Sequence, residues 1–240
     1  IISSNTSTIP LSILTQEMSD TMKADFCITH FFNPVRFMRL LEIVETPTMN
    51  KDKMSGLRDF CQNELGKGIV NCNDTPGFIG NRIGVYAMQV AMYEALERGL
   101  PVEIADALFG RPLGIPKTGV FGLYDLIGID LMKDVLASFK KELQENDPFM
   151  SVVAPHPLVE KLLEKGFNGN KGPGGFYQTT IVDDDEIVKA MNTSDMSYYD
   201  FDKVDLEIAR RVEKEGIKAL LDDDSEYGRY AFAVLAKIIN

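Results

Sequence analysis

The stretch THFFNPV (residues 29–35), followed by LLEIVE (residues 40–45), is the most informative part of this chain. It places a histidine, His30, at the end of one apolar run, then a proline turn, and a carboxylate, Glu42, inside the next apolar run. Such an arrangement can form a His–Glu pair, in which the carboxylate fixes the tautomer of the imidazole and stabilises its protonated form. His30 and Glu42 are therefore the candidate catalytic residues.

Two alternatives bear on this pair. A lone histidine is usually a core residue bonded to the backbone, and the chain has only 2 histidines. Glu45 is a second nearby carboxylate, but it lies three residues after Glu42 and so on the opposite face of a strand. The apolar neighbours of Glu42 predict a buried strand, where an unpaired carboxylate is costly. We therefore expect Glu42 to face His30 and Glu45 to be solvated at the strand end.

The composition indicates a globular protein of one large or two modest domains. The 240 residues are 45% hydrophobic and 25% charged. A net charge of −11 argues against nucleic-acid binding, and any polyanionic ligand would need a local cluster of Lys or Arg. Cys27, Cys61 and Cys72 are scattered without CxxC spacing, which favours a reducing compartment and predicts a cytoplasmic location. No apolar run is long enough to span a bilayer, and the first residues do not resemble a signal peptide.

Both ends of the sequence suggest a fragment of a longer protein. The chain opens with IISS (residues 1–4), without Met, as if leaving a buried strand. It closes on the amphipathic pattern of residues 231–240, with no turn signal after it. Helices expected over 203–221 and 226–239 are too few to close a core alone. We expect them to pack on sequence outside the chain or on another chain.

The first 75 residues have α/β character. Short apolar runs bounded by turn residues predict strands over 26–29, 38–44 and 68–72, and residues 50–65 predict a helix that ends at Gly66. No GxGxxG motif opens a helix after a strand, although this motif is the usual phosphate-binding turn of a dinucleotide-binding domain. If the segment belongs to such a domain, it is the last third of it.

A helical region follows. Thr75 is expected to be an N-cap with Pro76 at the first helical position, and apolar residues recur from Ile79 to Tyr93 at the spacing of a long packed helix that closes at Gly99. The apolar positions of that stripe are Ile79, Ile83, Tyr86, Val90 and Tyr93. Further predicted elements are helices over 101–107, 121–127 and 130–144, a short helix after 157 ending near 165, a loop over 110–119, a glycine-rich tail over 167–178 and a hairpin of 186–191 with 196–201.

Three further polar residues could contact a ligand, although each has a structural alternative. Ser7 lies in the hydroxyl-rich turn SNTST (residues 4–8), which alone would be interpreted as an N-cap for a helix near Pro10. Asn81 could be an ordinary helix residue or a hydrogen-bond donor to a substrate carbonyl. Lys171 in the glycine-rich tail could reach a phosphate or remain exposed. No metal site is predicted, because His156 has no second ligand at useful spacing.

Four stretches, taken together and in order, resemble the 3-hydroxyacyl-CoA dehydrogenases of fatty-acid β-oxidation. They are SNTS (4–7), HFFNP (30–34) with Glu42, DTPGFIGNR (74–82), and GNK (169–171) with GFY (175–177). The resemblance covers about residues 1–178. It implies the end of a Rossmann-type NAD-binding domain over 1–75 and an all-α C-terminal domain over 76–178, with the chain mostly helical overall. Residues 179–202 would be a linker with a possible hairpin, and 203–240 the start of a second helical domain.

The resemblance also implies an activity, the NAD-dependent oxidation of (S)-3-hydroxyacyl-CoA to 3-oxoacyl-CoA. His30 would be the general base and Glu42 would orient its imidazole. Ser7 and Asn81 would bind the acyl-CoA substrate, while Ser7, Asn33 and Lys171 would contact NAD. The implied partners are an acyl-CoA substrate and, through the helical domain, a second copy of the chain.

The sequence departs from the family pattern in three places. The glycine-rich nucleotide fingerprint is absent, so the fragment itself is expected to be inactive or weakly active. The usual GKKTG loop is GNKGP (residues 169–173), which weakens the assignment of Lys171, and the Arg36-Phe37 pair after Pro34 has no assigned role. Two other functions stay open: a helical interaction or dimerisation module, and a dehydrogenase of a related non-CoA 3-hydroxy acid.

Overall fold

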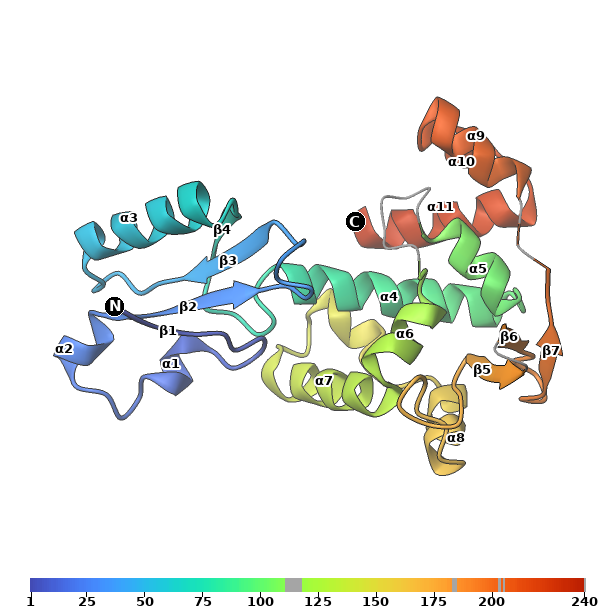
Figure 1. The fold of residues 1–240 in the computed structure, drawn as a ribbon, viewed down its shortest axis with the longest axis horizontal. Coiled ribbons are helices and arrows are strands. Elements are labelled where there is room, and N and C mark those ends of the chain that lie inside the picture. The colour runs from blue at the N-terminus through green and yellow to red at the C-terminus, as the bar shows by residue number, and fades with distance from the viewer. Residues whose placement is uncertain (111–117, 183–184, 203, 205, 240) are drawn as a thin grey trace. The chain divides into compact units, whose positions relative to one another are not determined.

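The computed structural model describes residues 1–110, 118–182, 185–202, 204 and 206–239. The chain divides into two compact units, Ile1–Gly84 and Val85–Asn240, and each unit has its own arrangement of helices and strands (Figure 1). The first unit is an α/β structure, and the second consists of helices with a small sheet. Most of the predicted loop over 110–119 lies outside the described residues.

A four-stranded sheet with the order β1-β2-β3-β4 forms the first unit. Its strands are β1 (Ile2–Ser4), β2 (Phe26–Phe31), β3 (Leu40–Val44) and β4 (Gly68–Cys72). β1 pairs parallel with β2, β2 pairs antiparallel with β3, and β3 pairs parallel with β4. The three predicted strands are therefore present, but β3 begins at Leu40 rather than Met38. The proline turn continues further than expected, because the N–H groups of Phe37 and Met38 both donate to the carbonyl of Pro34.

Cores lie on both faces of this sheet, because successive side chains of a strand point to opposite faces. Figure 1 shows α1 (Leu11–Leu14) on one side of the sheet and α3 (Lys51–Asp59) on the other. The two apolar clusters are Leu11, Phe26, Ile28, Val44, Cys72 and Phe78 on the α1 side, and Cys27, Leu41, Ile43, Met49, Met54 and Cys61 on the α3 side. By the same alternation, His30 and Glu42 lie on the α1 side.

The helix predicted over 50–65 is present but changes type along its length. The side chain of Asn50 caps α3 by accepting the N–H of Lys53, and α3 ends at Asp59. One turn of π-helix, η1 (Phe60–Glu64), follows before Gly66, whose φ is 65°. A short helix that the sequence did not predict, α2 (Asp20–Lys23), begins at the N-cap Ser19.

The beginning of the long helix α4 (Gly80–Glu97) differs from the prediction. Thr75 and Pro76 do not start it, because Gly77 and Phe78 have φ values of 71° and 50°, which are incompatible with a right-handed helix. The helix instead starts at Gly80. The apolar stripe is also only partly packed: Val90 is buried, whereas Ile83, in the first turn, is 56% exposed. That first turn belongs to the first unit, where Phe78 makes the core contact.

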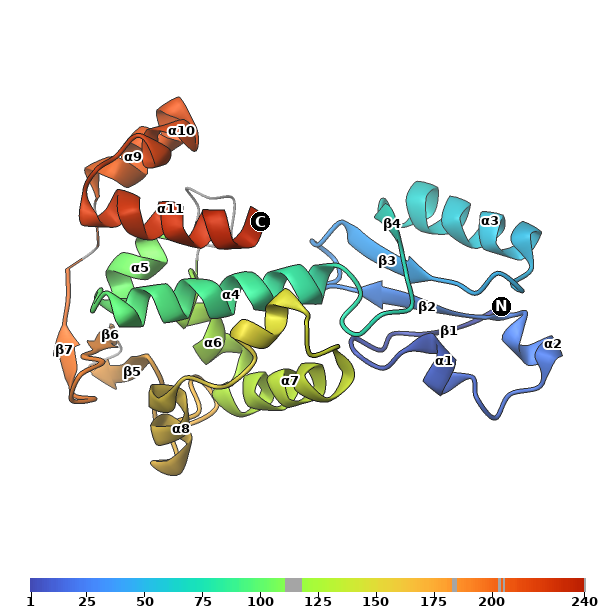
Figure 2. The ribbon, with the colours of Figure 1, turned by 180° about the vertical axis from the view of Figure 1, so that it is seen from behind.

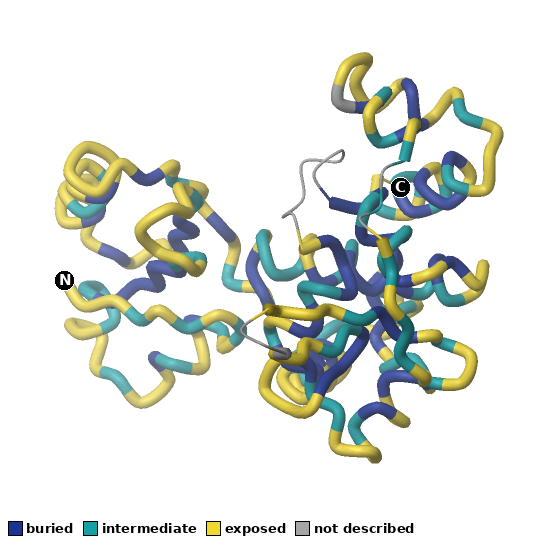
Figure 3. The backbone as a smooth tube through the Cα atoms, turned by 45° about the vertical axis from the view of Figure 1, so that its right-hand side comes forward, coloured by how far each residue is buried: buried dark blue, intermediate teal, exposed yellow. Residues whose placement is uncertain are grey.

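The second unit has one large apolar core, to which nearly all of its elements contribute. Figure 3 shows long buried segments within it. After α4, its helices are α5 (Val102–Leu108), α6 (Phe121–Ile127), α7 (Ile129–Glu142), a 3-10 helix η3 (Pro148–Ser151) and α8 (Pro157–Glu164). These agree with the predicted helices to within a few residues at their ends. All of these helices lie within residues 76–178, the region that the sequence predicted to be all-helical.

Two buried carboxylates fix the middle of the second unit. Asp106 accepts the N–H groups of Phe121 and Gly122 at the start of α6, at 2.7 and 2.9 Å, and the hydroxyl of Tyr177 at 2.8 Å. Asp125, within α6, accepts the N–H of Tyr177 at 2.7 Å. A Cβ at Gly175 would lie 2.0 Å from an oxygen of Asp125, so only glycine fits there. The glycine-rich tail is thereby held against α6.

Beyond the tail, the structure has a three-stranded antiparallel sheet where the sequence predicted a hairpin. The strands are β5 (Tyr177–Val182), β6 (Asp185–Met191) and β7 (Tyr198–Asp200), in that order. The predicted hairpin of 186–191 with 196–201 corresponds to β6 and β7. β5 was missed, because its first residues were assigned to the glycine-rich tail.

The last helices contribute to the core of the second unit, although the sequence suggested that they were too few to close a core. They are α9 (Glu207–Glu215), α10 (Lys218–Leu221) and α11 (Glu226–Ile239). Figures 1 and 2 both show α11 alongside α4, where Tyr230 donates to the carbonyl of Ala91 at 3.2 Å and Lys237 pairs with Glu94 at 2.5 Å. The helix predicted over 203–221 is broken at Gly216, whose φ is 79°.

Within the described residues, no helix is both long and apolar enough to cross a membrane. The same residues contain no group of three or more His, Cys, Asp or Glu side chains that could hold a metal ion.

Candidate functional site

The histidine and carboxylate of the first unit are direct partners across two strands. His30 on β2 and Glu42 on β3 are paired in the antiparallel register, and His30 Nδ1 lies 2.7 Å from Glu42 Oε2. His30 is 3% exposed and Glu42 is 1% exposed. The contact expected from the sequence is therefore present, and it commits Nδ1 of the imidazole to the carboxylate. Nε2 is the nitrogen that this arrangement leaves for proton exchange.

The same carboxylate also holds the beginning of α4. Glu42 Oε1 accepts the backbone N–H of Ile79 at 2.9 Å and of Gly80 at 2.6 Å. Burial by itself would raise the pKa of Glu42, but the hydrogen bonds from His30, Gly80 and Ile79 together hold that pKa below its ordinary value. Glu42 is therefore an anion that orients the imidazole and is itself oriented by the helix N-terminus.

Two aromatic rings lie beside the imidazole. The ring centroids of Phe32 and Phe78 lie 4.5 and 5.7 Å from that of His30. Gly80 permits this arrangement, because a Cβ at that position would lie 2.5 Å from the Phe32 ring. Glu45, the alternative carboxylate, instead pairs with Arg58 at 2.9 Å and is partly exposed.

The hydroxyl-rich turn is tied to the strand that carries His30. Asn5 Oδ1 accepts the N–H of Phe31 at 2.9 Å, and Asn81 Nδ2 donates to the carbonyl of Ser7 at 3.2 Å. Ser7 and Asn81 are thus brought together next to the His30 strand. Asn5 was missed in the sequence, where only its neighbours had chemistry that pointed to a ligand.

Ser7 does not act as an N-cap, which was the structural alternative. The amide N–H groups of Leu11 and Ser12 at the start of α1 are instead accepted by Asp74, at 2.5 and 2.8 Å. Asp74 comes from the turn before α4, 62 to 63 residues later in the chain. The turn of residues 74–77 thereby caps α1, the helix that follows the turn of residues 4–8.

Asn33 and Lys171, which the sequence assigned only to the cofactor, lie in different units. Asn33 is exposed and follows β2 in the first unit. Lys171 lies in the second unit, where its ammonium is 3.8 Å from Asp130 Oδ1 and about half exposed. His156 caps α8 by accepting the N–H of Leu158, which accounts for it without a metal.

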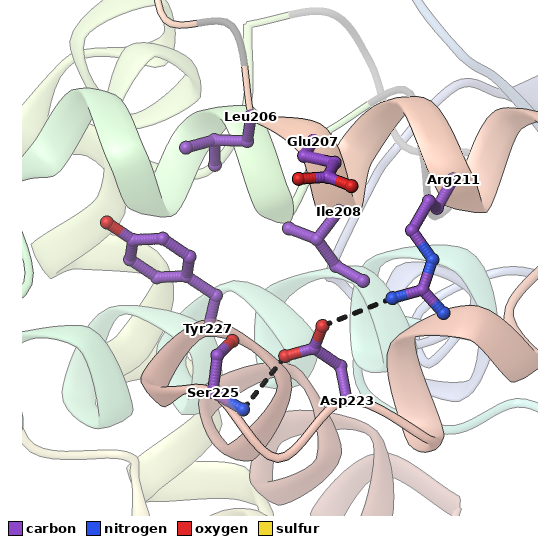
Figure 4. Close-up of a pocket in the computed structure, with 7 residues that line it drawn as sticks. All are labelled: Leu206, Glu207, Ile208, Arg211, Asp223, Ser225 and Tyr227. Atoms are coloured by element: carbon purple, nitrogen blue, oxygen red, sulfur yellow. Dashed lines mark hydrogen bonds and ion pairs between the residues drawn. The ribbon is translucent and has the colours of Figure 1, made fainter.

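A pocket in the second unit involves none of these residues (Figure 4). It lies between α9 and the start of α11, and its arginine, Arg211, pairs with Asp223 at 3.5 Å. Asp223 also accepts the N–H of Ser225. The lining residues are Leu206, Glu207, Ile208, Arg211, Asp223, Ser225 and Tyr227.

Comparison with known proteins first places the chain among NAD-linked dehydrogenases. Residues 1–75 match the family model described as 3-hydroxyacyl-CoA dehydrogenase, NAD binding domain, and residues 77–179 match that of the C-terminal domain. The chain belongs to the 3-hydroxyacyl-CoA dehydrogenase family, whose cofactor is NAD. The family and the cofactor predicted from the sequence are confirmed, as is the order of an NAD-binding domain followed by a helical C-terminal domain.

Several curated relatives are much longer than this chain. A putative fatty acid oxidation complex trifunctional enzyme of Rickettsia felis is 40% identical over 229 residues, which are 95% of this chain and 31% of that protein. A probable 3-hydroxyacyl-CoA dehydrogenase of Bacillus subtilis is 32% identical over 100% of this chain and 30% of its own length. The chain thus spans about a third of the length of these relatives.

Two solved structures have folds similar to that of this chain. FadB2 of M. tuberculosis matches with a TM-score of 0.64 and 29% identity, covering 75% of this chain and 60% of that protein. The 3-hydroxybutyryl-CoA dehydrogenase of Escherichia coli matches with a TM-score of 0.64 and 28% identity, covering 74% and 36%.

Proposed function

We propose that the protein containing this chain oxidises (S)-3-hydroxyacyl-CoA to 3-oxoacyl-CoA with NAD, a step of fatty-acid β-oxidation. The observation that carries this proposal is the buried pair of His30 and Glu42, with Nδ1 engaged and the carboxylate held by the start of α4. A scaffold has no need of a buried carboxylate held in this way, because a carboxylate in a core is costly. Membership of the dehydrogenase family supports the same reaction.

The roles of the pair follow from its geometry. His30 accepts the proton of the substrate 3-hydroxyl at Nε2, and Glu42 stabilises the imidazolium that results. In the neutral imidazole, donation of the Nδ1 proton to Glu42 leaves Nε2 with the lone pair that accepts the substrate proton. When bound in this domain, NAD would supply the acceptor for the hydride that leaves C3 of the substrate. Proton and hydride leave neighbouring atoms, so base, substrate oxygen and cofactor must converge at one place.

The polar residues near the pair suit these ligands. Ser7 and Asn33 are both exposed, and a hydroxyl and an amide are suitable partners for the carboxamide of the nicotinamide ring. We assign Ser7 and Asn81 to the oxygen atoms of the substrate, with the contact between Asn81 and the Ser7 carbonyl fixing their spacing. Lys171 is proposed as a further contact to NAD. That the substrate is an acyl-CoA is likewise proposed.

We further propose the domain boundaries predicted from the sequence, 1–75, 76–178, 179–202 and 203–240. The ranges matched by the two family models support the first two. The last segment would begin a second helical domain that packs on the first through α11. Three further statements stay predictions. They are that a helical face serves a homodimer, that the protein is cytoplasmic, and that this chain is a fragment.

The reaction is tested by NADH oxidation driven by acetoacetyl-CoA, with the natural full-length protein and its His30→Gln variant. We expect turnover to fall at least about a hundredfold with the fold unchanged by circular dichroism, the usual scale for the loss of a general base. His156→Gln is the matched control, because it makes the same change at the other histidine, which caps α8. Near-normal turnover of the His30 variant would make this histidine structural.

A different outcome would point to one of the other functions. If the unmodified protein reduces a free 3-oxo acid but not acetoacetyl-CoA, the substrate is a non-CoA acid. If it turns over neither compound, the dehydrogenase assignment fails and the helical interaction module becomes the better explanation.

A further inference from the structure

The turn of residues 34–39 presents an unusual surface. Phe37 is 76% exposed, more than any other phenylalanine among the large hydrophobic residues described as exposed. Val35 and Met38 on the same turn are 43% and 39% exposed. The turn directly follows β2, which carries His30, and directly precedes β3, which carries Glu42. An exposed ring at this place contributes nothing to a core.

Two arginines of the same turn have no partner in the described part of the chain. The side chains of Arg36 and Arg39 are exposed and make no ion pair or hydrogen bond there. Every other described arginine has an interaction: Arg58, Arg82, Arg98, Arg210, Arg211 and Arg229. In a chain with 36 acidic and 25 basic residues, two unpaired guanidinium groups on one turn are a local exception.

The backbone beneath these side chains is firmly held. Lys67 is 8% exposed, and its ammonium donates to the carbonyls of Val35 and Met38 at 2.5 and 2.8 Å. It also lies 5.7 Å from the centroid of the Phe31 ring. The N–H of Gly68 donates to the carbonyl of Arg39 at 2.7 Å. A buried lysine used in this way fixes the turn, so little backbone entropy remains to be lost when a ligand binds.

We propose that the 34–39 turn binds the phosphorylated adenosine end of coenzyme A, with Phe37 stacking on the adenine and Arg36 and Arg39 pairing with the phosphates. An exposed aromatic ring is a stacking surface for a base, and guanidinium groups match phosphate geometry. Coenzyme A carries a diphosphate and a separate 3′-phosphate, so it has more negative charge for two guanidinium groups than NAD has. This inference rests on the proposed function, because it deepens the assignment of an acyl-CoA substrate.

The test compares two thioesters in the NADH-oxidation assay of the full-length protein: acetoacetyl-CoA, and acetoacetyl-pantetheine, which lacks the phosphorylated adenosine. For the Arg36→Ala/Arg39→Ala double variant, we expect KM for acetoacetyl-CoA to rise about fivefold or more, from two exposed charge pairs. The variant's kcat and its KM values for acetoacetyl-pantetheine and NADH should not change. Added salt should raise KM for acetoacetyl-CoA in the unmodified protein and much less in the variant.

Matched controls separate charge and ring effects from general surface effects. Arg58→Ala removes the same charge from the same unit at an arginine that is paired with Glu45. The KM of the Arg58→Ala variant for acetoacetyl-CoA should not change. Phe37→Ala should raise that KM about fivefold or more through lost stacking. Phe60→Ala, at a phenylalanine of the same unit that is 52% exposed, should leave it unchanged.

Three results would overturn the assignment. An equal rise in KM for both thioesters would mean that the turn does not act on the adenosine end. A rise in KM for NADH would assign the turn to the cofactor. A change in oligomeric state of the double variant, measured by size exclusion, would make the turn a protein contact.

Binding of coenzyme A to the turn can also be measured without turnover. Should the unmodified protein show no turnover of either thioester, binding of coenzyme A alone is measured by calorimetry. Binding that is lost in the Arg36→Ala/Arg39→Ala variant would support the site, and absence of binding to the unmodified protein would overturn it.

Discussion

Glu42 on β3 accepts a hydrogen bond from the backbone N–H of Gly80 at 2.6 Å, so the carboxylate that orients His30 also fixes the start of α4. The two residues are 38 positions apart in the chain. A single side chain therefore couples the placement of the proposed base to the turn that carries Asn81, one residue after Gly80. Changes at Glu42 should affect both chemistry and stability.

The first prediction concerns the charge of Glu42. In Glu42→Gln the side chain keeps its shape and one oxygen that can accept N–H groups, but it no longer stabilises an imidazolium and can donate an amide N–H to Nδ1 instead. That donation selects the wrong tautomer of His30. We expect kcat with acetoacetyl-CoA and NADH to fall at least about tenfold. Unchanged kcat in a folded variant would show that the carboxylate has no part in the reaction.

The second prediction concerns acid stability. The pKa of Glu42 is held below its ordinary value of 4.5, so its hydrogen bonds stabilise the fold fully above that pH. This stabilisation is lost as pH falls through the lowered pKa, because the native state must then protonate a group that is bonded as an anion. Melting temperatures are measured from about pH 7 to about pH 3, a range that begins well above the ordinary pKa of Glu42 and extends below it. We expect them to fall more steeply for the unmodified protein than for Glu42→Gln. Parallel curves for both proteins would contradict this linkage.

The sequence predicted the core of the site because strand periodicity is a local signal. Two apolar runs joined by a proline turn put His30 and Glu42 into neighbouring strands, and alternation excluded Glu45. Burial then required a partner for the carboxylate. The register that makes His30 and Glu42 direct partners, and the 2.7 Å contact between them, came only with the structure.

The parts that could not be predicted depend on contacts between distant segments. Thr75-Pro76 has the local chemistry of a helix start, but the positive φ values of Gly77 and Phe78 delay α4 until Gly80. No local pattern shows that Glu42 would cap that helix, or that Asp74 would cap α1. Asn5 was overlooked for the same reason, since its partner Phe31 is 26 residues away.

The third prediction tests the space around the imidazole. In Gly80→Ala the new Cβ would lie 2.5 Å from the Phe32 ring, whose centroid is 4.5 Å from that of His30. The ring must move, and we expect a loss of about 1–3 kcal/mol in the free energy of unfolding, as for overpacked cores, together with lower turnover. Urea denaturation and the NADH assay measure the two effects.

Gly84→Ala is the matched control for this substitution. Gly84 lies one turn further along α4, and a Cβ there would have nothing within 4 Å. Because alanine favours helix over glycine, this variant should be more stable by up to about 1 kcal/mol, with normal turnover. Equal stability changes at Gly80 and Gly84 would show that Phe32 does not confine the site.

The last prediction concerns Asn5, which we assign as a positioning residue for the turn that carries Ser7. Its Oδ1 accepts the N–H of Phe31, next to His30, at 2.9 Å. In Asn5→Ala this N–H loses its partner and the 4–8 turn loses its anchor, so we expect kcat/KM for acetoacetyl-CoA to fall about tenfold, the scale of one hydrogen bond. Asn5→Asp keeps the accepting oxygen and should retain most of the activity. If both variants lose activity equally, the side-chain amide acts directly on a ligand. If neither loses it, the turn is held by its other hydrogen bonds, such as that from Ile9 N–H to Thr6 Oγ1 at 3.1 Å.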